Sequence, residues 1–118
     1  MTATLAAVLL LAPAKLTKPQ MVALVGKAAK LEKVALSEGC KAAMVSIAWH
    51  ESRWNPAAQN KRSTAYGLFQ FLNRTWESTG IRKTSDPLMQ TRAALKYMMR
   101  RYKTPSRAGS FRDRRGWY

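Results

Sequence analysis

Apolar residues recur every three or four positions along several stretches of the chain, which is the spacing of one helix face. The first stretch follows a strong helix start at Leu16–Met21, where Thr17 and Gln20 form a capping box and Pro19 suits the first turn. We therefore predict a helix that begins after Thr17. Its apolar face comprises Met21, Leu24, Val25, Ala28, Leu31 and Ala35.

A second helix is predicted from about Cys40 to Arg53, because the residue before a proline disfavours helix and Asn55-Pro56 follows. Its apolar face carries Met44, Ile47 and Ala48, and the next position on that face is Glu51. A carboxyl group on a core-facing stripe is costly to ionise, so this position favours the protonated form of Glu51. On spacing alone, an ordinary role for Glu51 as a helix cap or ion-pair partner remains open.

Residues 55–66 form a long polar segment that predicts a loop, and residues 66–72 fit either a short strand or the start of a helix. Asp86-Pro87 then starts another helix, with Asp86 as its N-cap. Thr104-Pro105 starts a last helix, which Gly116 ends. The pattern predicts an all-α domain of about five or six helices, or α+β at most by a minor strand or hairpin.

The first residues, Ala3 to Ala12, are apolar and uncharged. About 20 apolar residues are needed to span a bilayer, so this stretch is too short for a transmembrane helix. Ala12-Pro13-Ala14 resembles a signal-peptide cleavage site, but the basic leader of such peptides is missing. We expect residues 1–16 to form a packed helix or one that contacts a partner or membrane, and residues 17–118 to form one domain.

Composition narrows the classes of protein and of site. A length of 118 residues fits a single domain, while one cysteine and one histidine exclude an internal disulfide and the usual zinc sites, so no metal and no cofactor is expected. The net charge is +15, and residues 82–118 carry 11 basic residues against two acidic ones. Such a field attracts polyanions, among which nucleic acid and the anionic bacterial envelope are both candidates.

Three motifs occur in order: Glu51-Ser52-x-x-Asn55-Pro56-x-Ala58, then Ala65–Phe71, then Asp86-Pro87 followed by Gln90 to Met98. Over roughly residues 38–118 this order resembles the soluble lytic transglycosylase (SLT) domain of the lysozyme-like superfamily, and phage-encoded members most of all. The resemblance implies a lysozyme-like single domain whose helices surround a substrate cleft, and peptidoglycan as the substrate.

The resemblance also implies roles for individual residues. Glu51 matches the catalytic acid and base, Ser52 a serine that supports it, and Gln70 a glutamine that lines the cleft. Tyr97 matches a tyrosine whose hydroxyl bonds the catalytic glutamate, and Asn60 stands at a substrate-binding position where the family usually has serine. Further departures, which leave subsite details open, are Phe69 for methionine, Gln90 for asparagine and Ala94 for glycine.

The scarcity of carboxylates bears on the reaction type. Most glycosidases use two carboxylates. This chain has only six acidic residues, and among them Glu77 is the only plausible second acid beside Glu51. The simpler explanation of Glu77, which we favour, is a surface charge in the first turn of a helix. A single-carboxylate reaction therefore fits, and the resemblance implies that the substrate's N-acetyl group assists and that a 1,6-anhydro-MurNAc end forms.

The leading hypothesis is a phage-encoded peptidoglycan lytic transglycosylase that cleaves the MurNAc–GlcNAc β-1,4 bond, either in the phage virion or as a lysis enzyme in the infected bacterial cell. A lysozyme-type hydrolase of the same bond is one alternative. A second is a structural or adaptor protein that contacts other phage virion proteins. A third, nucleic-acid binding through arginines such as Arg100-Arg101 and Arg114-Arg115, is not expected to be the main or a specific function.

Overall fold

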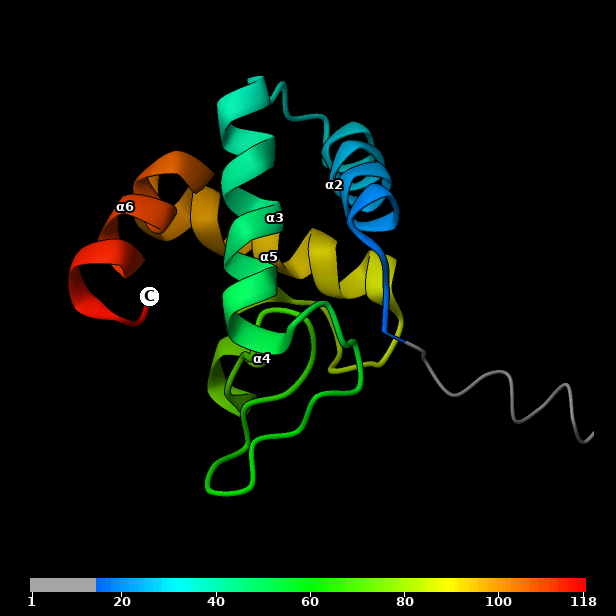
Figure 1. Cartoon of the computed structure of the whole chain (residues 1–118), viewed down its shortest axis with the longest axis vertical. Helices are drawn as coiled ribbons and strands as arrows, with labels where there is room; N and C mark the ends of the chain where they lie inside the picture. The colour runs from blue at the N-terminus through cyan, green and yellow to red at the C-terminus, as the bar shows by residue number, and fades with distance from the viewer. Residues whose placement is uncertain (1–14) are drawn as a thin grey trace, which may run out of the picture.

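Five helices make up the part of the chain that this computed structural model describes, residues 15–118 (Figure 1). They are α2 (Lys18–Glu32), α3 (Glu38–Ser52), α4 (Asn73–Thr79), α5 (Pro87–Tyr102) and α6 (Pro105–Arg115). The middle segment, residues 53–72 between α3 and α4, contains only isolated β-bridges, which pair Gln59 with Tyr66 and Tyr66 with Phe71. The all-α prediction is confirmed, while the apolar stretch Ala3–Ala12 lies outside the described residues.

The helix starts follow the local chemistry of the sequence. Thr17 and Gln20 form the expected capping box, Asp86 accepts hydrogen bonds from the first turn of α5, and Thr104 accepts one from Arg107 at the start of α6. The end of the first helix was predicted too late. Lys33 takes a left-handed conformation with φ 57°, which ends α2 three residues after the last buried positions, Ala28 and Ala29.

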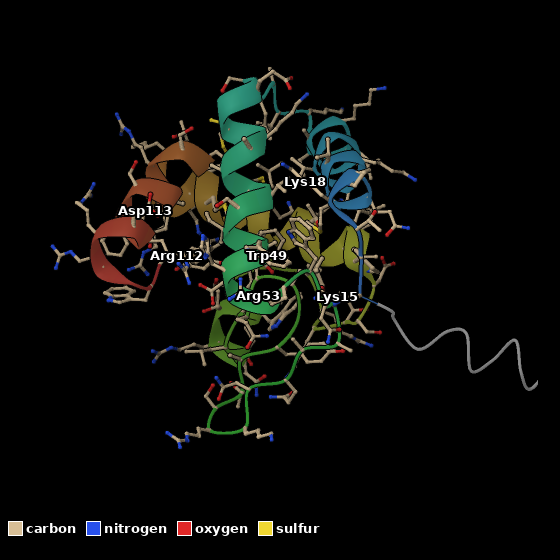
Figure 2. All side chains as sticks on the ribbon, viewed as in Figure 1. Lys15, Lys18, Trp49, Arg53, Arg112 and Asp113 are labelled. Atoms are coloured by element: carbon tan, nitrogen blue, oxygen red, sulfur yellow. The ribbon has the colours of Figure 1, made fainter. Side chains whose placement is uncertain are left out.

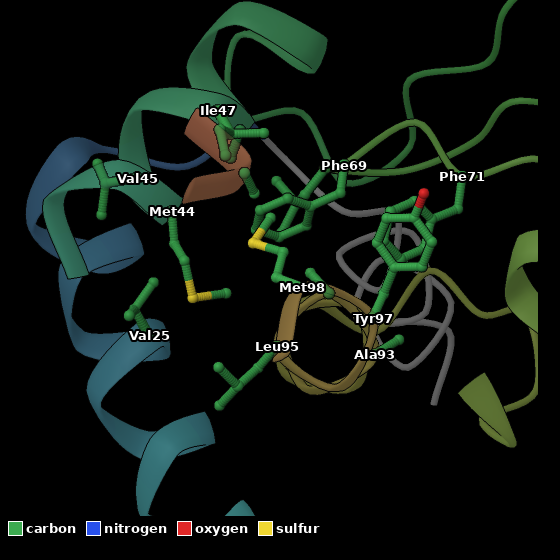
Figure 3. Close-up of a cluster of buried hydrophobic side chains, with 14 of the residues drawn as sticks. Val25, Met44, Val45, Ile47, Phe69, Phe71, Ala93, Leu95, Tyr97 and Met98 are labelled. Atoms are coloured by element: carbon green, nitrogen blue, oxygen red, sulfur yellow. The ribbon is translucent and has the colours of Figure 1, made fainter. Parts of the chain in front are cut away.

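The core lies between α2, α3 and α5, and α5 passes behind α3 in the view of Figure 1. Figure 3 shows its side chains converging from α2, α3, α5 and the segment between α3 and α4. The labelled members of this cluster are Val25, Met44, Val45, Ile47, Phe69, Phe71, Ala93, Leu95, Tyr97 and Met98. On the other side of α3, α6 packs along the same helix. α3 is therefore the central element, and its last turn meets the core, the middle segment and α6.

The Glu32 carboxylate fastens α2 to α5. Its Oε2 atom accepts a hydrogen bond of 2.7 Å from Arg92 Nε, and its Oε1 atom lies 2.9 Å from Lys96 Nζ. Burial opposes ionisation of this side chain, but the hydrogen bonds and charges of Lys96 and Arg92 outweigh it and lower the pKa of Glu32. None of the helices within residues 15–118 is long and apolar enough to cross a membrane.

Gln90 of α5 organises the middle segment. Its Oε1 atom accepts a hydrogen bond from the Leu68 amide, and its Nε2 atom donates to the carbonyls of Pro56 and Thr84. A Cβ atom on Gly67 would come within 2.6 Å of Gln90 Nε2, and Gly67 has φ 91°, so only glycine fits this turn. One buried amide thus fixes the turn formed by residues 67–70 against α5.

Candidate active site

One cavity of about 270 Å³ brings three of the candidate residues together. Glu51 reaches it from the last turn of α3, Gln70 from the turn that Gln90 holds, and Tyr97 from α5. The remaining lining residues are Phe71, Leu72, Thr75, Gly116, Trp117 and Tyr118. The segment after α6 therefore forms part of the cavity wall.

Glu51 is bound to an arginine of α6. Its Oε2 atom accepts a hydrogen bond of 2.7 Å from Arg112 Nε, and the two side chains are 18% and 19% exposed. Figure 2 shows Arg112 between α6 and α3. Arg112 thus supplies a charged hydrogen-bond partner for Glu51. Glu51 lies in the predicted helix, but the sequence did not predict this ion pair.

Tyr97 lines the cavity without bonding to Glu51. Its hydroxyl accepts a hydrogen bond of 3.2 Å from Arg101 Nη1, and no Tyr97–Glu51 hydrogen bond exists among the described residues. The Tyr97 ring packs against that of Phe71 (Figure 3), and the two ring centroids are 5.0 Å apart. The expected tyrosine–glutamate hydrogen bond is therefore not formed in this structure.

Two hydrogen bonds from its side-chain amide hold Gln70 at the cavity. Its backbone is left-handed, with φ 53°, and Nε2 donates hydrogen bonds of 2.9 Å to the carbonyls of both Ala58 and Gly67. A non-glycine residue in this conformation is strained, and these two bonds compensate. The side chain is thereby fixed at the cavity while being only partly buried.

The other two candidates do not reach this cavity. Ser52 is buried, and its hydroxyl donates a hydrogen bond of 2.9 Å to the Ala48 carbonyl one turn back in α3. Asn60 is exposed on the loop, where its Oδ1 atom accepts a hydrogen bond of 2.7 Å from the Arg62 amide. The structure thus unites Glu51, Gln70 and Tyr97, and it leaves Ser52 and Asn60 outside the cavity lining.

Glu77 also lies elsewhere. It is exposed on α4 and lines a separate cavity with Asn73 and Lys83. Within residues 15–118, Glu51 is the sole acidic side chain that lines the cavity shared with Gln70 and Tyr97. The chemistry available there is consequently that of one carboxyl group.

Three C-terminal residues at the site were not singled out from the sequence. Arg112 contacts Glu51, Trp117 lines the cavity, and the Tyr118 hydroxyl donates a hydrogen bond of 2.8 Å to the Phe69 carbonyl. Burial of the phenol, with the nearby Glu51 carboxylate as the next cause, raises the pKa of Tyr118 well above its usual value. The sequence indicated only that Gly116 ends the last helix, and no spacing predicted that the following residues reach the cavity beside Glu51.

A comparison with protein-family models matches residues 31–111 to the transglycosylase SLT domain, which is over half of the chain. The matched range includes Glu51, Gln70 and Tyr97, whereas Arg112 and the segment Gly116–Tyr118 lie beyond its end. Comparisons with curated proteins and with solved structures found no match.

Proposed function

The chain belongs to the transglycosylase SLT domain family, and on that premise we propose that it cleaves the MurNAc–GlcNAc β-1,4 bond of peptidoglycan and leaves a 1,6-anhydro-MurNAc end. The family itself indicates an enzyme that acts on peptidoglycan. The observation that supports the finer reaction is the single carboxylate, Glu51, in the cavity that Gln70 and Tyr97 also line. Both steps of the proposed reaction need only this group.

In the first step, protonated Glu51 gives its proton to the glycosidic oxygen while the bond from that oxygen to C1 of MurNAc breaks. The carbonyl oxygen of the substrate's own N-acetyl group bonds to C1 and takes the place of a protein nucleophile. In the second step, the Glu51 carboxylate removes the proton of the 6-hydroxyl, whose oxygen bonds to C1 and displaces the acetyl oxygen. Glu51 ends protonated as it began, and no water is consumed.

The contact between Arg112 and Glu51 bears on the two steps differently. In the second step Arg112 would form an ion pair with the Glu51 carboxylate, whereas in the first step its partner would be the neutral acid. It bonds Oε2, which leaves Oε1 to meet the substrate. In this proposal Arg112 orients the catalytic carboxyl group through a hydrogen bond that Tyr97 does not supply.

A hydrolase of the same bond is the competing reaction. Hydrolysis would call for a group that activates water, and a second carboxylate is the usual one. Glu77, the residue suggested for this task, lines a different cavity. The position of Glu77 therefore favours transglycosylation over hydrolysis.

Mass analysis of the muropeptides released from purified peptidoglycan tests the proposal. Wild-type protein should release 1,6-anhydro ends, Glu51→Gln should release none, and the matched control Glu77→Gln should behave as wild type. Glu51→Gln retains an acceptor for Arg112, so circular dichroism should show an unchanged fold. Reducing ends as the main product, or loss of activity in Glu77→Gln, would replace the proposal with a hydrolytic mechanism.

The setting of the reaction rests on the sequence alone. The likeness of the motifs to phage-encoded members supports a role in the phage virion or in lysis, and the net charge of +15 supplies attraction to the anionic envelope. Binding of Glu51→Gln to isolated cell envelopes should weaken steeply as salt is raised, because exposed charges are screened. Binding that does not depend on salt would refute the proposal that the positive charge attracts the protein to the envelope.

A further inference from the structure

Trp117 is the only large apolar side chain within residues 15–118 that is both strongly exposed and part of the lining of the Glu51 cavity. Three large apolar side chains within residues 15–118 are conspicuously exposed: Val22 at 47%, Leu31 at 48% and Trp117 at 53%. Val22 and Leu31 belong to α2, away from the Glu51 cavity, whereas Trp117 lines it. An exposed indole at the wall of a cleft is a feature of ligand-binding sites.

The indole is held in place while it remains open to solvent. Phe111 contacts its ring edge to face, with centroids 4.9 Å apart and planes at 82°, and the Arg101 guanidinium lies 5.8 Å from its centroid. On either side of Trp117 the chain is fixed: Gly116 turns it with φ 79°, and Tyr118 is hydrogen-bonded to Phe69. A side chain ordered in this way loses little conformational entropy when a ligand covers it.

The surroundings indicate which chemical class of ligand fits. The cavity lining includes the aromatic side chains of Trp117, Phe71 and Tyr97, of which only Trp117 is exposed, and polar groups that include Gln70 and Glu51. Flat aromatic surface beside a few hydrogen-bonding groups suits a pyranose ring, which presents C–H groups on its faces and hydroxyl or amide groups on its rim. A nucleotide phosphate fits less well, because within residues 15–118 the cavity lining includes no cationic side chain.

We propose that Trp117 is a sugar-stacking platform, on which an N-acetylhexosamine of the glycan strand lies next to the bond that Glu51 cleaves. The inference rests on the proposed function and extends it to the segment Arg112–Tyr118, which the family match does not cover. In consequence, the C-terminal segment supplies both a substrate contact through Trp117 and a positioning contact through Arg112.

The test uses the full chain carrying Glu51→Gln, so that the ligand is not consumed. The probe is soluble, uncrosslinked glycan strand of alternating GlcNAc and MurNAc, and calorimetry measures its affinity. Adding Trp117→Ala should weaken binding by roughly tenfold, since an aromatic contact and its buried area are lost. Adding Trp117→Phe should restore part of the affinity, and the control Leu31→Ala should leave it unchanged.

Tryptophan fluorescence supplies a second measurement on the same proteins. Saturating glycan strand should change the emission of the Glu51→Gln protein, and most of that change should disappear in the Trp117→Phe version. Unchanged affinity in Trp117→Ala, or no binding of the strand to Glu51→Gln, would overturn the inference.

Failure of the inference can be told from failure of the proposed function. If the wild type releases 1,6-anhydro ends while Trp117→Ala keeps full affinity, the platform is refuted and the reaction stands. If the wild type releases no muropeptides while binding still depends on Trp117, the reaction is refuted and the platform stands.

Discussion

Arg112 Nε lies 2.7 Å from Oε2 of Glu51, which joins α6 to the last turn of α3 by an ion pair between residues 61 positions apart. Both side chains are largely buried, so neither charge is well solvated without the other. The contact is therefore structural as well as electrostatic, and its removal should be felt in the stability of the fold.

Arg112→Gln should lower the free energy of unfolding by about 1.5–3 kcal/mol, because a hydrogen bond to a charged group is lost and Glu51 stays partly buried. Urea unfolding at neutral pH measures this. The matched control is Lys41→Gln, which removes an ion pair to Glu38, a carboxylate that is 93% exposed, and should change stability by less than about 1 kcal/mol. Equal losses in the two variants would contradict the role given to the Arg112 contact.

Gln90→Leu should be among the most damaging single substitutions in the chain. It leaves the Leu68 amide and the carbonyls of Pro56 and Thr84 without their partner, at a cost of about 3–4 kcal/mol. Thermal or urea unfolding measures the loss.

The control for that experiment is Gln59→Leu. Gln59, like Gln90, has three hydrogen bonds between its side chain and the backbone, but all three run from Nε2 to carbonyls and the residue is exposed on the loop. Water can replace its bonds, so the expected loss is below about 1 kcal/mol. A comparable loss in both variants would mean that burial of Gln90 adds nothing.

Glu32→Gln should flatten the dependence of stability on acid pH. Because the folded-state pKa of Glu32 is lowered, its contribution is present above the unfolded-state value near 4.5 and is lost as the pH falls through the folded-state value. Unfolding midpoints in urea at about pH 7 and about pH 3 should therefore differ less in Glu32→Gln than in the wild type. Parallel pH curves for the two proteins would refute this assignment.

Tyr118→Phe should change how stability depends on pH in the alkaline range. It removes one hydrogen bond to Phe69, worth about 1 kcal/mol. Because the pKa of Tyr118 is raised above 10.0 in the fold, its contribution is complete below that value and is lost as the pH rises toward the folded-state value. The wild type should therefore lose more stability than Tyr118→Phe between about pH 8 and about pH 11, measured by urea unfolding.

The sequence predicted those parts of the fold that depend on neighbouring residues. Helix starts at Thr17, Asp86 and Thr104 are set by side chains within three positions of the amides they cap. The end of α2 was missed because Lys33, an ordinary helix former, takes a left-handed conformation in which the Lys33 and Val34 amides bond carbonyls of the last turn.

Only those residues of the candidate site that belong to the sequence motifs could be predicted. The motifs proposed Glu51, Gln70 and Tyr97 as site residues, and the structure places these three around one cavity. The partner of Glu51 was not predictable, because no local pattern distinguishes Arg112 from the other arginines of α6. The direction of the Ser52 hydroxyl was equally hidden, since a buried serine near a helix end can bond its own helix or a neighbour.

The close approach of Gly67 to Gln90 restricts how this domain can be recombined with its relatives. A chimaera that takes the turn from one parent and α5 from another must inherit both residues together, because any Cβ atom at position 67 would collide with the glutamine amide. Loop grafting at this site is thus an exchange of two distant segments, and a library that varies residues 67–70 alone would sample mostly misfolded turns.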